Sequence, residues 1–363
     1  MLVKSIELDF FRNLGTTRIE FADGVNVFYG KNGAGKTNLL EAIFLLMLAR
    51  SPRGVNDAVM LAEGAEYYRL EGVVEFSGHE HDIAVAYQAG GRKRITIDKI
   101  AVRAAELFET CAAVSTAPED IELLSGGPSN RREFVNIYLS QASKKYMSDL
   151  IDYQKVLAQK NAYLKQVNNA ADTPYDELLI NFGSNIMMAR KAYLDAIAVN
   201  AAKNYSLISR GQNLTMEYQP SVRIENDDWG EGSIREHFAA KLRRNRERER
   251  VMQTAMVGPH RDDIDFSIRN LPARSHGSQG ELRTSAVSLK LAVFNYLKKV
   301  RGVNPVLLLD EIFAELDSGR KEMLVELFGE FGQIFLTSAS EIPETLMSRA
   351  RRFKIENGDV FPE

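Results

Sequence analysis

The segment GKNGAGKT at residues 30–37 restricts the possible folds of this chain more than any other stretch of its sequence. It fits the pattern G-x-x-x-x-G-K-[ST], with an apolar run ending in VNVFY before it and the apolar segment TNLLEAIFLLMLA after it. A strand, a glycine-rich turn and a helix in this order form a loop whose backbone N–H groups surround phosphate oxygens. This context disfavours a tight glycine turn without a ligand. We therefore expect an α/β fold that binds a nucleoside triphosphate.

The last residues of this loop carry side chains suited to a triphosphate and its metal ion. Lys36 is expected to reach the β- and γ-phosphate oxygens, and Thr37 to ligate Mg²⁺ through its hydroxyl. A second segment, PVLLLDE at 305–311, predicts a buried strand that ends in two carboxylates. Taken alone, it would be a buried strand meeting solvent. Together with the phosphate loop, it predicts that Asp310 holds Mg²⁺ and that Glu311 orients and deprotonates the attacking water.

The charge balance limits how the chain could bind nucleic acid. The formal net charge of the 363-residue chain is −3, which gives no general attraction to nucleic acid, so DNA binding needs a locally basic surface. The segment KLRRNRERER at 241–250 offers one, and Arg243, Arg244 and Arg246 are its candidate DNA-binding residues. The alternative is a solvated face of a charged helix, which is the more common meaning of such a run.

Cysteine content and apolar stretches indicate a cellular compartment. The single cysteine, Cys111, excludes an internal disulfide framework and fits a reducing cytosol. The first residues, MLVKSIELDF, alternate polar and apolar side chains and do not fit a signal peptide. The longest apolar stretch, at 42–49, is too short to cross a membrane. We expect a cytoplasmic protein without a membrane partner.

Hydrophobic periodicity changes along the chain and predicts its organisation. Residues 1–118 are rich in alternating strand patterns, residues 119–210 carry helical spacing, and residues 211–363 end in alternating strands and helices. Such alternation favours a parallel sheet covered by helices. We expect one α/β ATPase body built from 1–118 and 211–363, with 119–210 inserted as a helical subdomain.

The order of three motifs resembles the ABC class of ATPases, which includes the heads of SMC and Rad50 proteins. SQGE at 278–281 lies between the phosphate loop and the strand PVLLLDE. Alone, Ser-Gln-Gly-Glu before a helix is an ordinary N-cap. In the ABC class such a segment opens a helix and caps the γ-phosphate of ATP bound to another subunit. The resemblance therefore implies this role for Ser278, Gln279 and Gly280, and an α/β P-loop ATPase head as the fold.

Two further segments carry the same resemblance. ELD at 315–317 resembles the D-loop along the dimer interface, and FFRN at 10–13 resembles a segment whose arginine approaches the nucleotide. The nucleotide-binding residues expected from the motifs and the resemblance are Arg12, Gly30, Lys31, Asn32, Gly33, Ala34, Gly35, Lys36, Thr37, Asn38, Ser278, Gln279, Gly280 and Asp317.

The chain departs from the ABC pattern at two places. Where most members carry a histidine after the next strand, this chain offers Thr337 and Ser338. The sequence also does not identify a Q-loop glutamine, because Gln88 lies in an expected hairpin. Both departures favour slow turnover, with ATP acting as a switch.

Longer blocks resemble the RecF family of bacterial recombination-repair ATPases. They are PEDIELLSGGPSNRREFVN (118–136), YQKVLAQKNAYLK (153–165), GPHRDDIDFSI (258–268), SQGELRTSAVSLKLA (278–292) and PVLLLDEIFAELDSGRKEMLVELF (305–328). The resemblance implies an ATP-dependent homodimer that binds double- and single-stranded DNA, with a preference for gap junctions. It also implies slow, DNA-stimulated ATP hydrolysis, and work with RecR and RecO to load RecA. Glu311, and Glu281 within SQGEL, depart modestly from the residues common in the family.

Three other classes of protein are alternatives to a DNA-repair ATPase. A nucleotide-gated adaptor, in which hydrolysis only resets the dimer, stays open. The helical segment at 119–250 disfavours a transporter subunit, and the absence of long heptads excludes an SMC-type cohesive protein. His260, within GPHRDD, is expected to orient its loop rather than to act in acid–base chemistry.

Overall fold

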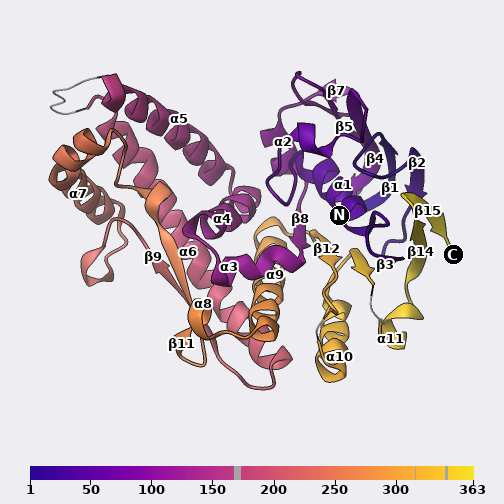
Figure 1. Ribbon diagram of the computed structural model, residues 1–363. Coiled ribbons are helices and arrows are strands. Elements are labelled where there is room, and N and C mark those ends of the chain that lie inside the picture. Colours follow the sequence, from indigo (N-terminus) through magenta and orange to yellow (C-terminus); the bar gives the residue numbers. More distant parts are fainter. Residues whose placement is uncertain (167–172, 315, 340–341) are drawn as a thin grey trace. The chain divides into compact units, whose positions relative to one another are not determined.

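The computed structural model describes residues 1–166, 173–314, 316–339 and 342–363. Within these residues the chain forms two compact units, coloured by sequence in Figure 1. The first, here called the head, contains Met1–Asp120, Asn204–Gly211 and Gln279–Glu363. The second, here called the arm, contains Ile121–Lys203 and Gln212–Ser278. Glu315 of the expected D-loop lies outside the described residues.

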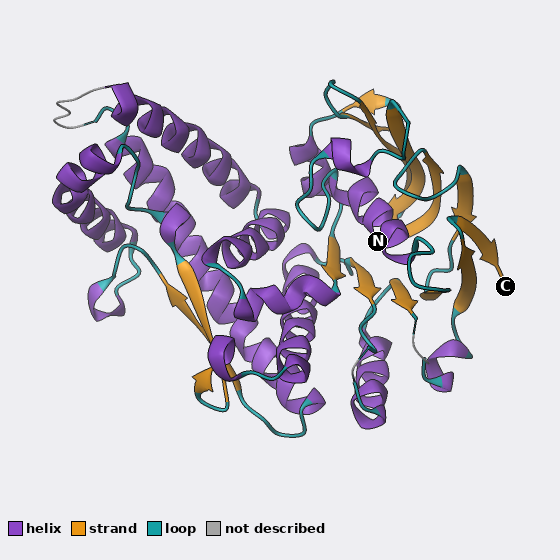
Figure 2. Cartoon of the chain, viewed as in Figure 1, coloured by secondary structure: helices purple, strands orange, loops and turns teal. Residues whose placement is uncertain are grey.

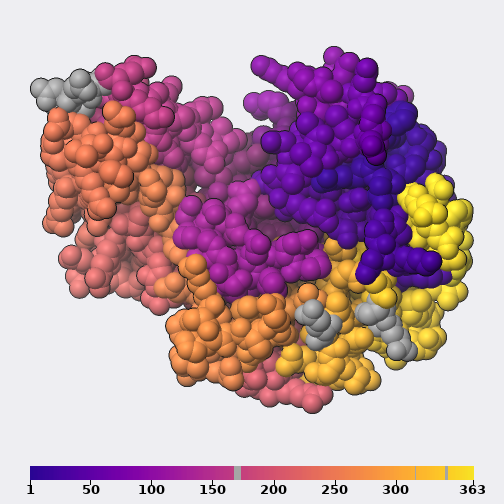
Figure 3. All heavy atoms as spheres, in the orientation of Figure 1, coloured from indigo at the N-terminus to yellow at the C-terminus, as the bar shows by residue number. Residues whose placement is uncertain are grey.

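A largely parallel sheet forms the centre of the head. Its strand order is β15-β14-β3-β13-β12-β8, in which only β15 runs antiparallel to its described neighbour. The bounds are β3 Val25–Tyr29, β8 Ala113–Thr116, β12 Val306–Asp310, β13 Ile334–Ser338, β14 Arg351–Glu356 and β15 Asp359–Pro362. Every residue of β8, β12 and β13 is buried, as expected of strands covered on both faces. Both ends of the chain build this sheet, and in Figure 3 the yellow C-terminal residues lie against indigo N-terminal ones.

An antiparallel sheet forms the second layer of the head, in the order β2-β1-β4-β5-β6-β7. Its bounds are β1 Leu2–Asp9, β2 Thr17–Glu20, β4 Tyr67–Phe76, β5 His79–Gln88, β6 Arg94–Ile97 and β7 Ile100–Ala101. Helix α1 (Lys36–Leu48) packs against strands of both sheets. This position explains why α1 is apolar on all sides, since a helix between two layers has no solvent face. Gln333 also ties the layers together, because its buried amide bonds to the backbone of Val3 and Ala22.

The remaining helices of the head follow the alternation expected for the end of the chain, except for the first, which lies in the segment 1–118 that was expected to be rich in strands. They are α2 (Ala104–Thr110), α9 (Gln279–Arg301), α10 (Ser318–Leu327) and α11 (Glu344–Met347). Helix α9 packs against β8. The sequence predicts a helix up to residue 330, whereas α10 ends at Leu327 and a short 3-10 turn covers Phe328–Glu330. No helix among the described residues combines the length and apolar character needed to cross a bilayer.

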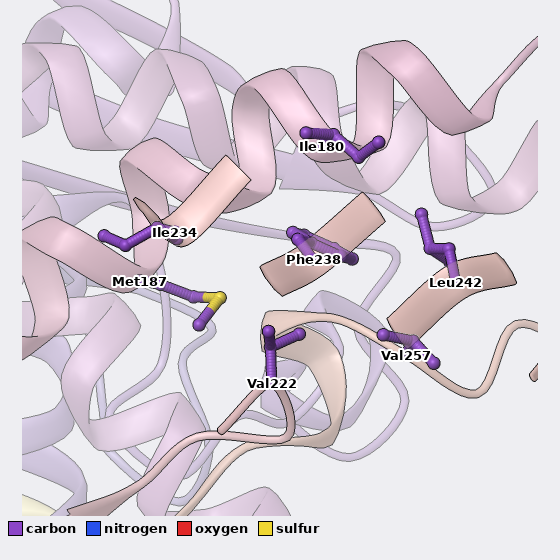
Figure 4. Close-up of a cluster of buried hydrophobic side chains, with 7 residues drawn as sticks. All are labelled: Ile180, Met187, Val222, Ile234, Phe238, Leu242 and Val257. Atoms are coloured by element: carbon purple, nitrogen blue, oxygen red, sulfur yellow. The ribbon is translucent and has the colours of Figure 1, made fainter. Parts of the chain in front are cut away.

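The arm is mainly helical and carries one short sheet, β11-β10-β9 (Figure 2). Its helices are α3 (Glu122–Ser125), α4 (Pro128–Ala142), α5 (Lys144–Gln166), α7 (Glu231–Met252), α8 (Ala273–His276) and most of α6 (Asp176–Ile208). Its strands are β9 (Leu214–Gln219), β10 (Asp263–Ile268) and β11 (Leu271–Pro272). Figure 4 shows its apolar cluster, formed by Ile180, Met187, Val222, Ile234, Phe238, Leu242 and Val257.

The division in space differs from the division into 1–118, 119–210 and 211–363 drawn from the sequence. Residues 212–278 join the helices of the arm rather than the ATPase body. Two buried ion pairs show why. Lys160 Nζ of α5 lies 2.7 Å from Glu249 Oε2 of α7, and Arg190 Nη1 of α6 lies 3.1 Å from Asp262 Oδ2. Breaking a buried pair leaves an uncompensated charge, so these contacts hold the later segment to the earlier one.

Candidate nucleotide-binding site

The predicted phosphate loop lies between β3 and α1 in the head, as the sequence indicates. Gly33 and Gly35 have φ angles of 79° and 116°, in the left-handed region that favours glycine. Gly35 is also the N-cap residue of α1. The glycines therefore allow the chain to turn so that the loop precedes the positive end of α1, where an anion is favoured.

Lys36 is almost completely buried at the start of α1, with 5% of its side chain exposed. Its Nζ donates to the carbonyl oxygens of Gly30 at 2.9 Å and Lys31 at 3.2 Å. The same nitrogen lies 3.3 Å from Glu311 Oε1. The loop carbonyls and Glu311 thus hold the ammonium group in place, and only Glu311 among them carries a compensating charge.

Asp310 ends β12, where its carboxylate meets two hydroxyl groups. Thr37 Oγ1 donates to Asp310 Oδ1 at 3.0 Å, and Thr337 Oγ1 donates to the same oxygen at 2.5 Å. Burial raises the pKa of Asp310 above its usual value and the charge of Glu311 adds to this, while both hydroxyl bonds act in the opposite direction. A hydroxyl and a carboxylate on adjacent elements are hard oxygen ligands, so Thr37 and Asp310 fit Mg²⁺.

Glu311 follows Asp310 with a φ of 48°, which is unusual for a residue with a side chain. Its backbone N–H donates to Thr337 through the carbonyl oxygen at 3.2 Å and Oγ1 at 3.1 Å. Its Oε2 accepts a hydrogen bond from the Ala339 N–H at 2.8 Å. Strained backbone of this kind persists where its surroundings fix it. The surroundings here direct the Glu311 carboxylate toward Lys36.

Three of these residues, Lys36, Thr37 and Glu311, line an open cavity of about 490 Å³. It is lined by Asn32, Gly33, Gly35, Lys36, Thr37, Asn38, Glu311, Ala314 and Ala339. Its volume is in the usual range for a small-molecule site. Two other predicted loop residues, Gly30 and Lys31, contribute carbonyl groups to Lys36, and Ala34 is buried behind the loop.

The FFRN segment contacts the phosphate loop through Asn13, which the sequence analysis did not single out. Asn13 Nδ2 donates to the Gly33 carbonyl at 2.9 Å, and Asn13 Oδ1 accepts from Asn38 Nδ2 at 2.7 Å. Arg12, which was predicted, donates instead to both carboxylate oxygens of the buried Glu41. Its approach to a nucleotide therefore stays a prediction. The only sequence signal for Asn13 is its place next to Arg12.

Of the two residues at the place of the histidine in the ABC pattern, Thr337 contacts both site carboxylate residues, and which of the two replaces the histidine stays open. Thr337 bonds to Asp310 through its hydroxyl and to Glu311 through both of its oxygens. Gln88 is exposed at the end of β5, in the hairpin that the sequence predicts. It is therefore a strand residue of the antiparallel sheet.

The second predicted phosphate-binding segment does not contribute to this cavity. Ser278 and Gln279 are exposed, and α9 begins at Gln279. None of the described residues lining the cavity comes from 278–280. Asp317 caps α10 by accepting the Arg320 N–H at 3.0 Å, and this bond lowers the pKa of Asp317. The nucleotide contacts of Ser278, Gln279, Gly280 and Asp317 therefore stay predictions.

The predicted basic residues lie on α7 in the arm. Arg243 and Arg244 are exposed, Arg246 is partly exposed, and Leu242 faces the apolar cluster. The structure therefore confirms a helix with one buried side and one basic side. A solvated helix face and a DNA-binding face share this appearance, so DNA binding there stays a prediction.

Comparison with known proteins identifies the family. The model described as RecF/RecN/SMC N terminal domain matches residues 2–357. DNA replication and repair protein RecF of Lachnoclostridium phytofermentans is 34% identical over 368 residues, covering 99% of each chain. RecF of Streptococcus uberis is 37% identical over 348 residues, covering 94% of this chain and 93% of that protein.

Comparison with solved structures agrees with this family. The recombination mediator protein RecF-ATP in the RecFOR pathway superimposes with a TM-score of 0.90 at 32% identity, over 100% of this chain and 97% of that chain. An Smc head bound to the C-winged helix domain of ScpA gives a TM-score of 0.58 at 14% identity, with 100% and 97% covered. The latter likeness shows the fold alone.

Proposed function

The chain belongs to the RecF family of ABC-type ATPases, and from this premise we propose that it is a DNA-repair protein whose ATP-bound form dimerises and binds DNA. The observation that carries the proposal is that Lys36, Thr37 and Glu311 line one cavity, with Asp310 bonded to Thr37. These groups supply, in this order, a cation for phosphate, two metal ligands and a base for water.

The chemistry follows from the contacts of these groups. The triphosphate attracts Lys36 away from Glu311, because its oxygens carry more negative charge than one carboxylate. Glu311, still held by the Ala339 N–H, is then free to accept a proton from the attacking water. Mg²⁺, held by Thr37 and Asp310, would neutralise charge on the phosphate oxygens. Slow turnover fits a site in which Thr337 and Ser338 stand where a histidine is common.

Dimerisation joins this cavity to the exposed segment Ser278–Gly280 of a second copy. The proposal is supported by the accessibility of Ser278 and Gln279 and by their absence from the described lining of their own chain's cavity. DNA would be bound by phosphate contacts that include Arg243, Arg244 and Arg246, with little dependence on base sequence. RecR and RecO are the proposed partners, because a solved relative is described as part of the RecFOR pathway. Loading of RecA at gap junctions and DNA-stimulated hydrolysis complete the proposal.

Binding to a gapped duplex with ATP, with ADP and without nucleotide tests this function. We expect tight binding only with ATP, and ATP hydrolysis that rises when the duplex is added. Lys36→Ala is the control, since a chain that does not bind ATP should give the nucleotide-free affinity under all three conditions. Equal DNA affinity of the wild type in all three conditions would refute an ATP-gated DNA-binding protein. ATP-gated dimers without DNA binding would instead favour the nucleotide-gated adaptor.

A further inference from the structure

Arg320 of α10 lies next to Gly280, the glycine of the exposed segment at the start of α9. A Cβ atom placed on Gly280 would lie 3.5 Å from Arg320 Nη1. Both residues belong to the head. The guanidinium group therefore stands beside the backbone that is proposed to approach the phosphate of a second subunit.

Asp317 holds Arg320 in this position without burying its charge. The Asp317 carboxylate accepts the Arg320 N–H at 3.0 Å, and Arg320 Nε lies 3.4 Å from Asp317 Oδ2. The side chains are 23% and 59% exposed. An exposed pair of this kind contributes little to stability, and a cation in the first turn of a helix is opposed by the helix dipole. Helix stability alone therefore does not favour an arginine at this position.

A second guanidinium group lies at the same turn. Arg210 Nη2 approaches Gly319 so closely that it occupies space which a side chain there would need. The charge of Arg210 also acts on Asp317. Arg210 and Arg320 thus flank the exposed carboxylate of Asp317.

We propose that Arg320 contacts the terminal phosphate of the nucleotide held by a second copy of this chain and stabilises the charge formed there during hydrolysis. The proposal rests on the proposed ATP-dependent dimer. Arg320 is not among the described residues that line the cavity of its own chain, and the proposal therefore assigns it to the nucleotide of the partner. A guanidinium group is always charged and presents two parallel donors to phosphate oxygens.

The step that Arg320 assists is hydrolysis of the terminal phosphate. A water oxygen forms a bond to the γ-phosphorus, and the bond from that phosphorus to the bridging oxygen of the β-phosphate breaks. ADP leaves with the electron pair, and Glu311 accepts the water proton. Negative charge spreads over the transferred and leaving oxygens in the transition state, where a cation from outside the cavity is most effective.

Mixing two defective variants tests whether Arg320 acts on the partner's nucleotide. Glu311→Gln keeps Arg320 but loses the base, and Arg320→Ala keeps the base but loses the guanidinium group. We expect each variant alone to hydrolyse ATP at least tenfold more slowly than the wild type. In a mixed dimer, one cavity combines Glu311 of one chain with Arg320 of the other. Random mixing should therefore restore about a quarter of the wild-type rate, since half of the dimers carry one complete site.

Lys321→Ala is the matched control, because it removes an equal charge from the next position of α10 and should leave the rate unchanged. Arg320→Lys should recover only part of the rate, since lysine keeps the charge but not the paired donors. No recovery on mixing, with both variants dimeric in ATP, would overturn the proposal. So would a wild-type rate for Arg320→Ala, or weaker ATP binding by its monomer. If the wild type stays monomeric in ATP, the proposed function itself fails, which sedimentation before mixing reveals.

Discussion

Lys36 Nζ of the phosphate loop lies 3.3 Å from Oε1 of Glu311, at the end of the strand that carries both site carboxylates. The two side chains are 5% and 19% exposed, so water screens their attraction only in part. The cation that would bind phosphate and the base that would activate water neutralise each other before nucleotide arrives. Nucleotide binding therefore has to separate them, which couples occupation of the site to its catalytic activation.

Glu311→Gln should retain ATP binding and lose hydrolysis. The amide removes the charge that competes with phosphate for Lys36, so ATP affinity should be equal to or higher than that of the wild type. The rate should fall about a hundredfold or more, because the base is lost. Equilibrium binding of a fluorescent ATP analogue and single-turnover hydrolysis measure the two effects. Glu322→Gln, an exposed change on α10, is the matched control. A hydrolysis rate equal to that of the wild type would contradict the role of Glu311.

Thr337→Val should slow hydrolysis about tenfold, equivalent to about 1.4 kcal/mol in the barrier. Valine has the shape of threonine but neither donates to Asp310 nor accepts the Glu311 N–H. The Glu311 N–H keeps its bond to the carbonyl of residue 337 and Asp310 keeps its bond from Thr37, so the free energy of unfolding should fall by only about 1 kcal/mol. Initial rates at several Mg²⁺ concentrations, together with thermal unfolding, check both effects. Thr337→Ser keeps the hydroxyl and should restore the rate. A serine variant as slow as the valine variant would show that the hydroxyl is not the cause.

Replacing Arg243, Arg244 and Arg246 together by alanine should weaken DNA binding and make it less sensitive to salt. Each lost phosphate contact lowers the slope of log affinity against log salt by about 0.9. The measurement is affinity for a duplex with ATP present, from 50 to about 300 mM salt. The control is a second triple alanine variant, at Arg18, Arg69 and Arg94 of the antiparallel sheet, which removes the same number of positive charges. An unchanged slope would leave the α7 arginines as a solvated helix face.

Acid should destabilise the arm through His260. Burial lowers the pKa of His260 from 6.5 to about 4, and the bond from Nε2–H to the Ala255 carbonyl opposes this. The other ring nitrogen accepts from Tyr153 Oη at 2.6 Å, as expected of a neutral ring that orients its loop. Between pH 6.5 and 4 the imidazole of His260 is protonated in the unfolded chain but not in the folded chain. The free energy of unfolding therefore falls as the pH falls. Above pH 7 this group should have no effect.

Denaturant unfolding at pH 7.5 and pH 5, followed by the fluorescence of Trp229, measures this dependence. Trp229 is the single tryptophan of the chain and packs against the apolar cluster of the arm. The free energy of unfolding of the wild type should fall by about 2 kcal/mol from pH 7.5 to pH 5 because of His260, and His260→Gln should abolish this part of the decrease. His276→Gln, at an exposed position of α8, should retain it. Equal pH dependence in wild type and His260→Gln would contradict the assignment.

The sequence predicts those parts of the site in which one short segment determines both the backbone element and the functional side chains that it carries. GKNGAGKT encodes a turn that needs its glycines, and PVLLLDE encodes a strand buried on both faces. Both segments form the expected elements, and the structure brings Lys36 to Glu311. Asn13 could not be found in this way, since its role depends on bonds to Gly33 and Asn38 that join distant segments. An asparagine in a turn normally bonds to its own backbone, so its sequence signal is ambiguous.

Sequence periodicity also does not predict the boundary between the head and the arm. The alternating pattern of 211–278 is typical of strands and helices in either unit. Its placement in the arm depends on Arg190, whose side chain reaches Asp262 and the Pro259 carbonyl, and on Lys160, which reaches Glu249. Such pairs depend on tertiary contacts between residues far apart in the chain. The polar block GPHRDD therefore has a structural explanation in the arm that its sequence did not reveal.

Sedimentation velocity of the purified chain with ATP and Mg²⁺, with ADP and without nucleotide tests the central claim most directly. The account predicts a monomer without nucleotide and a dimer with ATP. It also predicts that Ser278→Ala binds ATP as a monomer but dimerises at least tenfold more weakly, because the substitution removes the hydroxyl proposed to contact the partner's phosphate. A wild-type chain that stays monomeric at saturating ATP and high protein concentration would contradict the account.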